Sequence, residues 1–205
     1  MSNENGHGLE KLTKALANYF PHEDAGNLAI LLSTGCRRDS LRYEEIDLED
    51  DLKPDVILLA YRERLLVPLK SLSGSAWQDK VFSFADGEFY CLPRLVKSLV
   101  IEAEKTGLWD RDTALREVLE EAGDRDVERT LEFLEYIIGL AANYRTQIKE
   151  MQAVNSEFDF RLDIHDMLDH FIRCGIMSPL TRVSLLDGSP TYEINPSLRW
   201  DIDNG

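Results

Sequence analysis

The sequence predicts a mainly α-helical fold with small β-hairpins, an α+β class in which two similar halves follow one another. Three observations predict it. Apolar residues recur at helical spacing through most of the chain. Two Asp-Gly turns, Asp86-Gly87 and Asp187-Gly188, each stand between short alternating segments, which is typical of β-hairpins. Each hairpin follows an apolar helix and a Pro-Leu segment, so the same pattern occurs twice.

Three helices are predicted in the first half by apolar residues spaced three or four apart, over residues 9–20, 23–34 and 55–66. Pro21 stops the first helix, and Gly35 is a candidate C-cap for the second. Pro54 suits the first turn of the third, because a helix leaves its first N–H groups unpaired. A hairpin follows, with strands expected at residues 77–84 and 88–92.

Four further helices are predicted by the same periodicity, between Pro93 and Gly107 and over residues 113–122, 126–151 and 163–174. Asp112 and Asp163 are candidate N-caps, because a carboxylate accepts hydrogen bonds from the free N–H groups of a first turn. Gly123 and Gly175 end helices. A second hairpin is expected with strands at residues 182–186 and 191–194, and residues 157–161 form a candidate short strand.

The segment 126–151 is the longest uninterrupted helical pattern of the chain. Its apolar residues spread over most of the helix circumference, so such a helix has to be covered on more than one side. Two interpretations stay open. Either this is the central helix of the fold, or it forms half of a homodimer interface.

The chain of 205 residues is long enough for one large domain or two small ones, and it is acidic, with a formal net charge of −15. The imbalance is uneven: residues 1–97 hold 12 bases and 16 acids, whereas residues 98–205 hold 11 bases and 22 acids. At long range the second part repels a phosphate backbone. Charge therefore disfavours nucleic acid as the partner.

Cysteine usage and hydropathy indicate a cytoplasmic protein by elimination. Cys36, Cys91 and Cys174 lie far apart without a CxxC motif, which argues against a disulfide framework or a zinc ribbon and suits small buried side chains. The first eight residues are polar and do not resemble a signal peptide. No apolar run is long enough to cross a membrane, so no membrane partner is expected.

Residues 163–194, reading DIHDMLDHFIRCGIMSPLTRVSLLDGSPTYEI, resemble the helix-then-wing end of winged helix-turn-helix domains. Residues 55–92 resemble it more loosely, because a longer segment separates the helix from the hairpin. The resemblance implies a tandem of winged-helix-like halves, residues 1–93 and 94–205, with residues 126–151 as a central or dimerisation helix. The family includes DNA-binding regulators and acidic tandem modules that bind only proteins, so the fold does not choose the partner.

The two halves differ in how well they suit DNA. In a DNA reader the helix before the wing presents cationic and amide side chains to bases and phosphates. The second half would present Asp163, Asp166 and Asp169 there, beside His165, His170 and Arg173. The candidate nucleic-acid contacts therefore all lie in the first half: Arg37, Arg38, Arg62, Arg64 and Lys80.

Aromatic residues crowd the first hairpin, and three of them, Trp77, Phe89 and Tyr90, are candidates for docking a protein. The alternative is that this hairpin packs on its own helices. The sequence predicts a non-enzymatic protein-interaction or regulatory module that binds a protein partner. The alternative function is a DNA-binding transcriptional regulator that uses the first half.

A metal-dependent enzyme is the third interpretation. Asp166 and His170 share a helix face and are two candidate metal ligands. No third ligand is indicated, and an acidic solvent-exposed face explains the same residues. No phosphate-binding glycine loop and no GxSxG motif occurs in the sequence. We therefore expect no catalytic residue, no metal and no cofactor.

Overall fold

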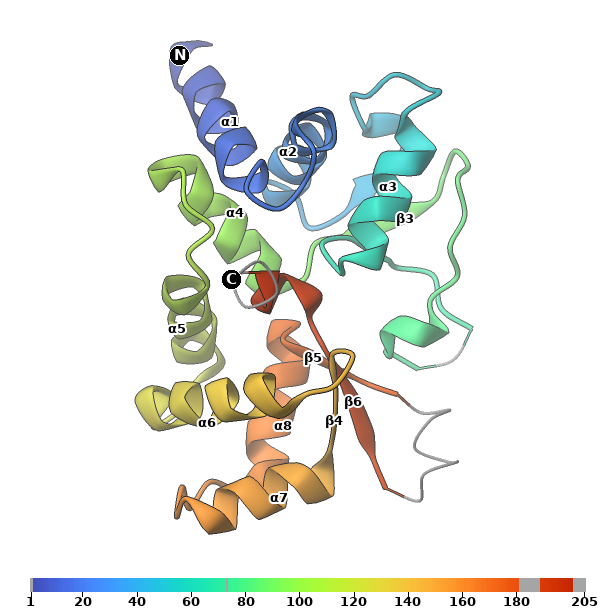
Figure 1. The fold of residues 1–205 in the computed structure, drawn as a ribbon. Helices are drawn as coiled ribbons and strands as arrows, with labels where there is room; N and C mark the ends of the chain where they lie inside the picture. Colours follow the sequence, from blue (N-terminus) through green and yellow to red (C-terminus); the bar gives the residue numbers. More distant parts are fainter. Residues whose placement is uncertain (1, 73, 181–188, 201–205) are drawn as a thin grey trace.

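The computed structural model describes residues 2–72, 74–180 and 189–200. Over these residues the protein is mainly helical, with eight α-helices and two small antiparallel sheets, which confirms the α+β class (Figure 1). None of the helices in this part of the chain has the length and apolar character that crossing a membrane requires.

The first half combines helices with a three-stranded sheet. Its elements are α1 (Ser2–Leu16), α2 (His22–Cys36), β1 (Leu41–Arg42), η1 (Tyr43–Glu45), α3 (Lys53–Arg62), β2 (Val67–Pro68), η2 (Trp77–Asp79), β3 (Phe89–Cys91) and α4 (Arg94–Thr106), where η marks a 3-10 turn. The strand order is β1-β3-β2, and both neighbours are antiparallel to β3. Tyr90 in β3 pairs with Leu41 on one side and with Pro68 on the other.

The second half has the same strand order. Its elements are α5 (Arg111–Ala122), α6 (Val127–Leu140), β4 (Arg145–Gln147), α7 (Ile148–Glu157), α8 (Ile164–Cys174), β5 (Met177–Pro179), β6 (Thr191–Ile194) and η3 (Pro196–Leu198). The strands pair in the order β4-β6-β5, again antiparallel. Tyr192 in β6 pairs with Thr146 and with Pro179.

Three glycines and one proline lie at helix ends as predicted. Gly107, Gly123 and Gly175 follow α4, α5 and α8 in the left-handed conformation, with φ of 80°, 86° and 74°. Glycine adopts this conformation without a Cβ clash, which is why it ends helices so often. Pro54 lies in the first turn of α3, also as predicted.

Side-chain caps confirm one prediction and correct another. The Asp163 carboxylate accepts hydrogen bonds from the backbone N–H groups of His165 and Asp166, so it caps α8. For α5 the cap is Asp110, whose carboxylate accepts from the Thr113 N–H at 3.1 Å. Asp112, the predicted cap, lies one residue inside the helix.

The expected C-cap role of Gly35 is wrong, because Gly35 lies inside α2 and the helix ends after Cys36. Its physical role is close packing. A Cβ built at Gly35 would stand 2.4 Å from Leu92 Cδ1. Because glycine carries only a hydrogen in place of a side chain, α2 can pack closely against the segment between β3 and α4. The first helix also differs, since α1 ends at Leu16, ahead of Pro21.

The first predicted hairpin is wrong in one of its strands. β3 does pair, but its partners are β1 and β2 rather than residues 77–84. Within that predicted strand, Trp77–Asp79 forms the 3-10 turn η2, and Lys80 makes only an isolated bridge with Ser71. Because sheet partners are chosen across long sequence separations, alternation beside an Asp-Gly turn did not identify them.

The predicted helix over residues 126–151 does not exist as one element. α6 ends at Leu140, and the chain turns through Asn143 and Tyr144, whose φ values are 52° and 57°. β4 and α7 follow. The helix is interrupted because residues 145–147 hydrogen-bond to β6, which satisfies their backbone groups as a sheet. Neither the central helix nor the dimerisation helix of that length is present.

Two further strand predictions lie near α7 and β6. Residues 157–161 form no strand: Phe158 ends α7, and Asp159 and Arg161 have positive φ values. The predicted strand at residues 191–194 is confirmed as β6. Its expected partner at residues 182–186 lies outside the described residues, and the described partners of β6 are β4 and β5.

One hydrophobic core runs through both halves. α4 packs against α1, α2 and α5, and α5 packs against α6 and α8, so α4 and α5 carry the core from one half to the other (Figure 1). Trp200 packs at the junction of the two halves. Its ring lies 4.9 Å from that of Tyr19 and 5.0 Å from those of Phe20 and Trp109.

Candidate functional site

Arg37 and Arg38, two of the predicted nucleic-acid contacts, follow the C-terminal end of α2 and both form ion pairs. Arg37 Nη2 lies 3.2 Å from Glu104 Oε1 on α4, and Arg38 Nη1 lies 2.6 Å from Glu45 Oε2 in η1. Both cationic side chains stay half exposed. Each positive charge therefore has a neutralising carboxylate well within a Debye length, which weakens its pull on phosphate.

Arg64 contacts the second half of the chain. Its guanidinium donates from Nε and Nη2 to the two carboxylate oxygens of Glu193 on β6, at 3.0 and 3.2 Å. Its side chain is only 14% exposed, and its cation lies 4.7 Å from the centre of the Tyr61 ring. This corrects the prediction of a nucleic-acid contact, because the guanidinium is buried against protein.

Arg62 and Lys80 are the other two predicted cations. Arg62 is exposed at the end of α3, and Lys80 is half exposed after η2. Neither takes part in an ion pair between described residues. These two side chains therefore keep the charge that a phosphate contact needs.

The predicted aromatic docking residues are mostly inside the protein. Trp77 is 7% exposed and Tyr90 is 1% exposed, so neither is available to a partner, which corrects the prediction for both. Their burial agrees with the alternative prediction, that this segment packs on its own helices. Phe89 alone of the three lies on the surface, where the Arg42 guanidinium stands 5.1 Å from its ring centre.

The acidic and histidine residues of α8 divide between surface and core. Asp163, Asp166 and Asp169 are exposed as expected. His170 is buried, and its Nδ1 lies 3.8 Å from Asp124 Oδ2, so it does not join the exposed face. Among the described residues, no three His, Cys, Asp or Glu side chains form a group that could hold a metal ion.

The three cysteines are unsuited to nucleophilic chemistry. Burial raises the pKa of the Cys36 thiol to about 11, and the carboxylate of Glu104 adds to the effect. Burial also raises the pKa of the Cys91 and Cys174 thiols. Because the thiolate is the reactive form, all three stay protonated and unreactive at neutral pH.

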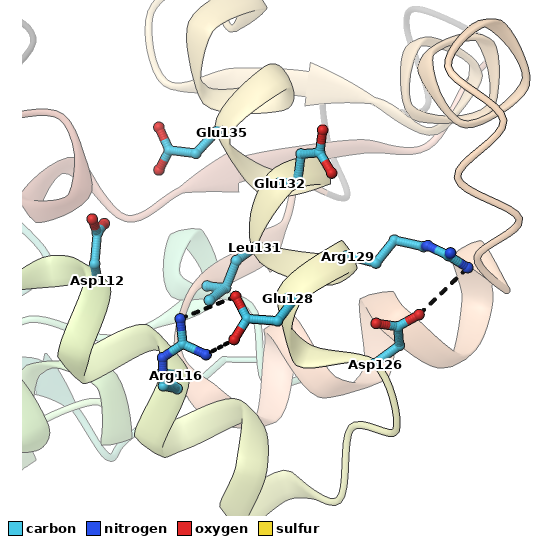
Figure 2. A pocket seen from close by; sticks show the side chains of 8 residues that line it. All are labelled: Asp112, Arg116, Asp126, Glu128, Arg129, Leu131, Glu132 and Glu135. Atoms are coloured by element: carbon cyan, nitrogen blue, oxygen red, sulfur yellow. Dashed lines mark hydrogen bonds and ion pairs between the residues drawn. The ribbon is translucent and has the colours of Figure 1, made fainter.

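A groove of about 560 Å³ lies between α5 and α6. Five carboxylates and two guanidiniums line it beside one leucine, from Asp112, Arg116, Asp126, Glu128, Arg129, Leu131, Glu132 and Glu135 (Figure 2). Five negative against two positive charges leave three negative charges in excess. Negatively charged side chains are thus concentrated in this groove.

Ion pairs neutralise only part of this groove. Figure 2 shows Arg116 reaching from α5 to the Glu128 carboxylate on α6, and Arg129 lying 3.4 Å from Asp126. Arg111, just outside the groove, donates from Nη2 to Glu135 Oε2 at 2.9 Å. Within the described residues, Glu132 takes part in no ion pair.

Apolar surface continues from the groove along α6. A second depression of about 340 Å³ is lined by Glu135, Tyr136, Gly139 and Leu140. Leu140 is 67% exposed, and the exposed ring of Phe158 lies over Tyr136 with 4.4 Å between ring centres. Glu135 lines both depressions, so they adjoin at this residue. We name the groove residues together with Tyr136, Gly139, Leu140 and Phe158 the α6 surface.

A protein-family model matches residues 10–203, a range that covers most of both halves and the whole α6 surface. The chain belongs to this family. The family model names no activity, and no curated protein and no solved structure is significantly similar to the chain.

Sequence reasoning missed the α6 surface, although a signal for it is present. Glu128, Glu132, Tyr136 and Leu140 follow one another at intervals of four, which places them along one ridge of a helix. The ridge changes from acidic to apolar along α6. Because every apolar residue of 126–151 was assigned to one broad buried stripe, Tyr136 and Leu140 were expected to be covered.

Proposed function

We propose that this protein is a non-enzymatic interaction or regulatory module of two winged-helix-type halves, and that its partner is a protein. The element order supports the fold. In the second half α6, β4, α7, α8, β5 and β6 follow one another, with the strand order β4-β6-β5. The first half repeats this strand order as β1-β3-β2, with α3 before the last two strands. Winged helix-turn-helix domains are built in this way.

The exposed face of α8 is the observation that carries the choice of partner. In a DNA-binding domain of this type, the helix before the wing enters the major groove. The exposed side chains of α8 are those of His165, Asp166, Asp169 and Arg173, with the Asp163 cap beside them. Carboxylates at that position repel the phosphates on both sides of the groove. A protein surface is the partner that such a face favours.

The second candidate function is a DNA-binding transcriptional regulator that uses the first half. Arg62 on α3 and Lys80 after η2 favour it, because both keep a charge that no described carboxylate neutralises. Asp55 and Leu58 are the other exposed residues of α3. Two separate cations give a weak phosphate contact, so this function ranks second.

Fluorescence anisotropy with a labelled DNA duplex at low salt separates the two functions. We expect no saturable binding at protein concentrations up to about 100 μM, where proteins that bind DNA non-specifically already do so. Binding by the wild type that disappears in the Arg62→Glu, Lys80→Glu double variant would establish the DNA function instead. Lys14→Glu, which reverses an exposed cation of α1 in the same direction, is the control for a general charge effect.

Affinity capture from a cell extract tests the protein partner directly. The immobilised protein is incubated with extract that has been treated with nuclease, and bound proteins are identified by mass spectrometry. Proteins retained after nuclease treatment support the proposal. Proteins that are captured only from untreated extract are held through nucleic acid, and that result contradicts it.

A further inference from the structure

We infer that the α6 surface binds a basic amphipathic helix of a partner polypeptide, an inference that rests on the proposed function. The partner's apolar side chains lie on Tyr136, Leu140 and Phe158. Its lysine or arginine side chains reach into the groove beside Glu132 and Glu135. This is the helix-in-groove mode of peptide recognition, in which an apolar face supplies affinity and charges at its edge set orientation.

The apolar part of the surface is supported from below by the core. Phe160 is buried, and its ring lies 5.8 Å from Tyr136 and 5.4 Å from the fully buried ring of Phe133. The Phe158 and Tyr136 rings, tilted by 32° to each other, thus rest on this buried base. A partner that binds such a preformed surface loses little affinity to ordering it.

Charge complementarity selects a basic partner. After Arg111 is added to the groove residues, five carboxylates face three guanidiniums, so an excess of two negative charges remains beside the apolar patch. Among the described residues, Glu132 has no cationic partner. The formal net charge of −15 adds long-range attraction for a cationic segment. An acidic membrane or a nucleic acid meets repulsion at the same place.

A second copy of this chain fits the surface poorly. A two-fold dimer brings each patch against its own image, so Glu132 and Glu135 of one copy would lie near the same residues of the other. Like charges juxtaposed at an interface cost binding energy. The same surface that suits a basic helix therefore resists self-association.

The length of α6 sets the length of the partner segment. Its 14 residues extend about 21 Å at 1.5 Å per residue, with the groove along its N-terminal half and the apolar patch along its C-terminal half. A partner helix of about four turns covers both parts. Its cationic residues lie over the first part and its apolar residues over the second.

The test uses the full chain and a fluorescein-labelled helical peptide of about 18 residues, with leucines at i, i+3, i+4 and i+7 in one half and lysines along the same face in the other half. A matched peptide carries glutamates in place of the lysines. We expect saturable anisotropy change with the lysine peptide and none with the glutamate peptide. Leu140→Ser and Glu132→Lys are each expected to weaken binding about tenfold, a change of about 1.4 kcal/mol.

Two control variants carry the same chemical changes elsewhere. Leu108→Ser alters a leucine that is 62% exposed in the segment between α4 and α5, and Glu10→Lys reverses an exposed charge on α1. Both should bind the lysine peptide like the wild type. Unchanged melting temperatures establish that Leu140→Ser and Glu132→Lys remain folded. Hydrogen exchange should show peptide-dependent protection in α6.

Distinct results separate this inference from the function on which it rests. If neither α6 variant weakens binding, or if the controls weaken it equally, the inference is wrong. If the lysine peptide does not bind while nuclease-resistant protein capture persists, the α6 surface is not the docking site but the proposed function stands. Saturable DNA binding that depends on Arg62 and Lys80 removes the proposed function itself.

Discussion

The Arg64 guanidinium donates to both carboxylate oxygens of Glu193, a residue 129 positions further along the chain. Both side chains are largely buried, at 14% and 16% exposure. The pair joins the end of α3 to β6, and Asn195 donates from its amide to the Arg64 backbone carbonyl beside it. Arg64, which the sequence predicts to contact DNA, thus links the two halves of the chain.

Removing one partner of this pair should destabilise the protein. Arg64→Ala leaves the Glu193 carboxylate in a mostly buried place without its partner, at a cost of about 2–3 kcal/mol. Urea denaturation followed by tryptophan fluorescence measures the loss. Arg42→Ala, which removes a solvent-exposed pair with Glu44, is the control and should cost under about 1 kcal/mol. Equal losses in both variants would contradict a structural role for Arg64.

Gly175 should tolerate no side chain. Its φ of 74° suits glycine. An added Cβ would stand 2.5 Å from Pro93 Cβ, and the rigid proline ring cannot move aside to relieve that contact. We expect Gly175→Ala to lower the free energy of unfolding by about 2–4 kcal/mol, the sum of left-handed strain and overpacking. Gly123→Ala isolates the strain, because φ is 86° there but no atom lies within 4 Å of the added Cβ. Its cost should be about 1–2 kcal/mol.

The break after α6 predicts opposite effects of glycine at two nearby positions. Asn143 has φ of 52°, so Asn143→Gly relieves strain and should leave the unfolding free energy unchanged or raise it by about 0.5 kcal/mol. Glu132→Gly lies in the middle of α6 and should lower it by about 1 kcal/mol. Chemical denaturation of both variants gives the comparison. If Asn143→Gly is the more destabilising, the chain continues as a helix through residue 143.

Stability should fall at alkaline pH because of Cys36. Burial raises the pKa of its thiol from 9.0 to about 11, so the folded state holds the proton more tightly than the unfolded state. The stabilisation is complete below pH about 9 and is lost as pH rises to about 11. Denaturation across this window should show a smaller decline for Cys36→Ala than for the wild type. Parallel declines would mean that the thiol is not responsible.

Local signals in the sequence predicted much of the helical frame. Pro54 at the start of α3, Gly107 and Gly123 after α4 and α5, and the Asp163 cap of α8 were all foreseen. Each of these effects depends on a few neighbouring residues, since a cap or a left-handed glycine acts within one helical turn. For α5 the predicted N-cap, Asp112, lies two residues after the observed one, Asp110.

Sheet partners and the candidate site could not be predicted in the same way. Alternation around Asp86-Gly87 indicated a strand at β3 but could not identify β1 and β2 as its partners. Periodicity over residues 126–151 could not reveal that Thr146 pairs with Tyr192, which interrupts the helix. The α6 surface depends on that interruption, because it leaves Leu140 at a helix end in solvent.

By itself the sequence determined the helix-rich class, the ends of α4, α5 and α8 at glycine, and the acidic charge, because composition and short-range hydrogen bonding are local properties. The tertiary structure alone decided which charges stay free. Arg64 lies beside Glu193, and His170 beside Asp124, only because the fold brings distant segments together. Glu132, in contrast, forms no ion pair with a described residue. Ion pairing and burial depend on distances in space that residue spacing does not contain, and they decide what the surface can bind.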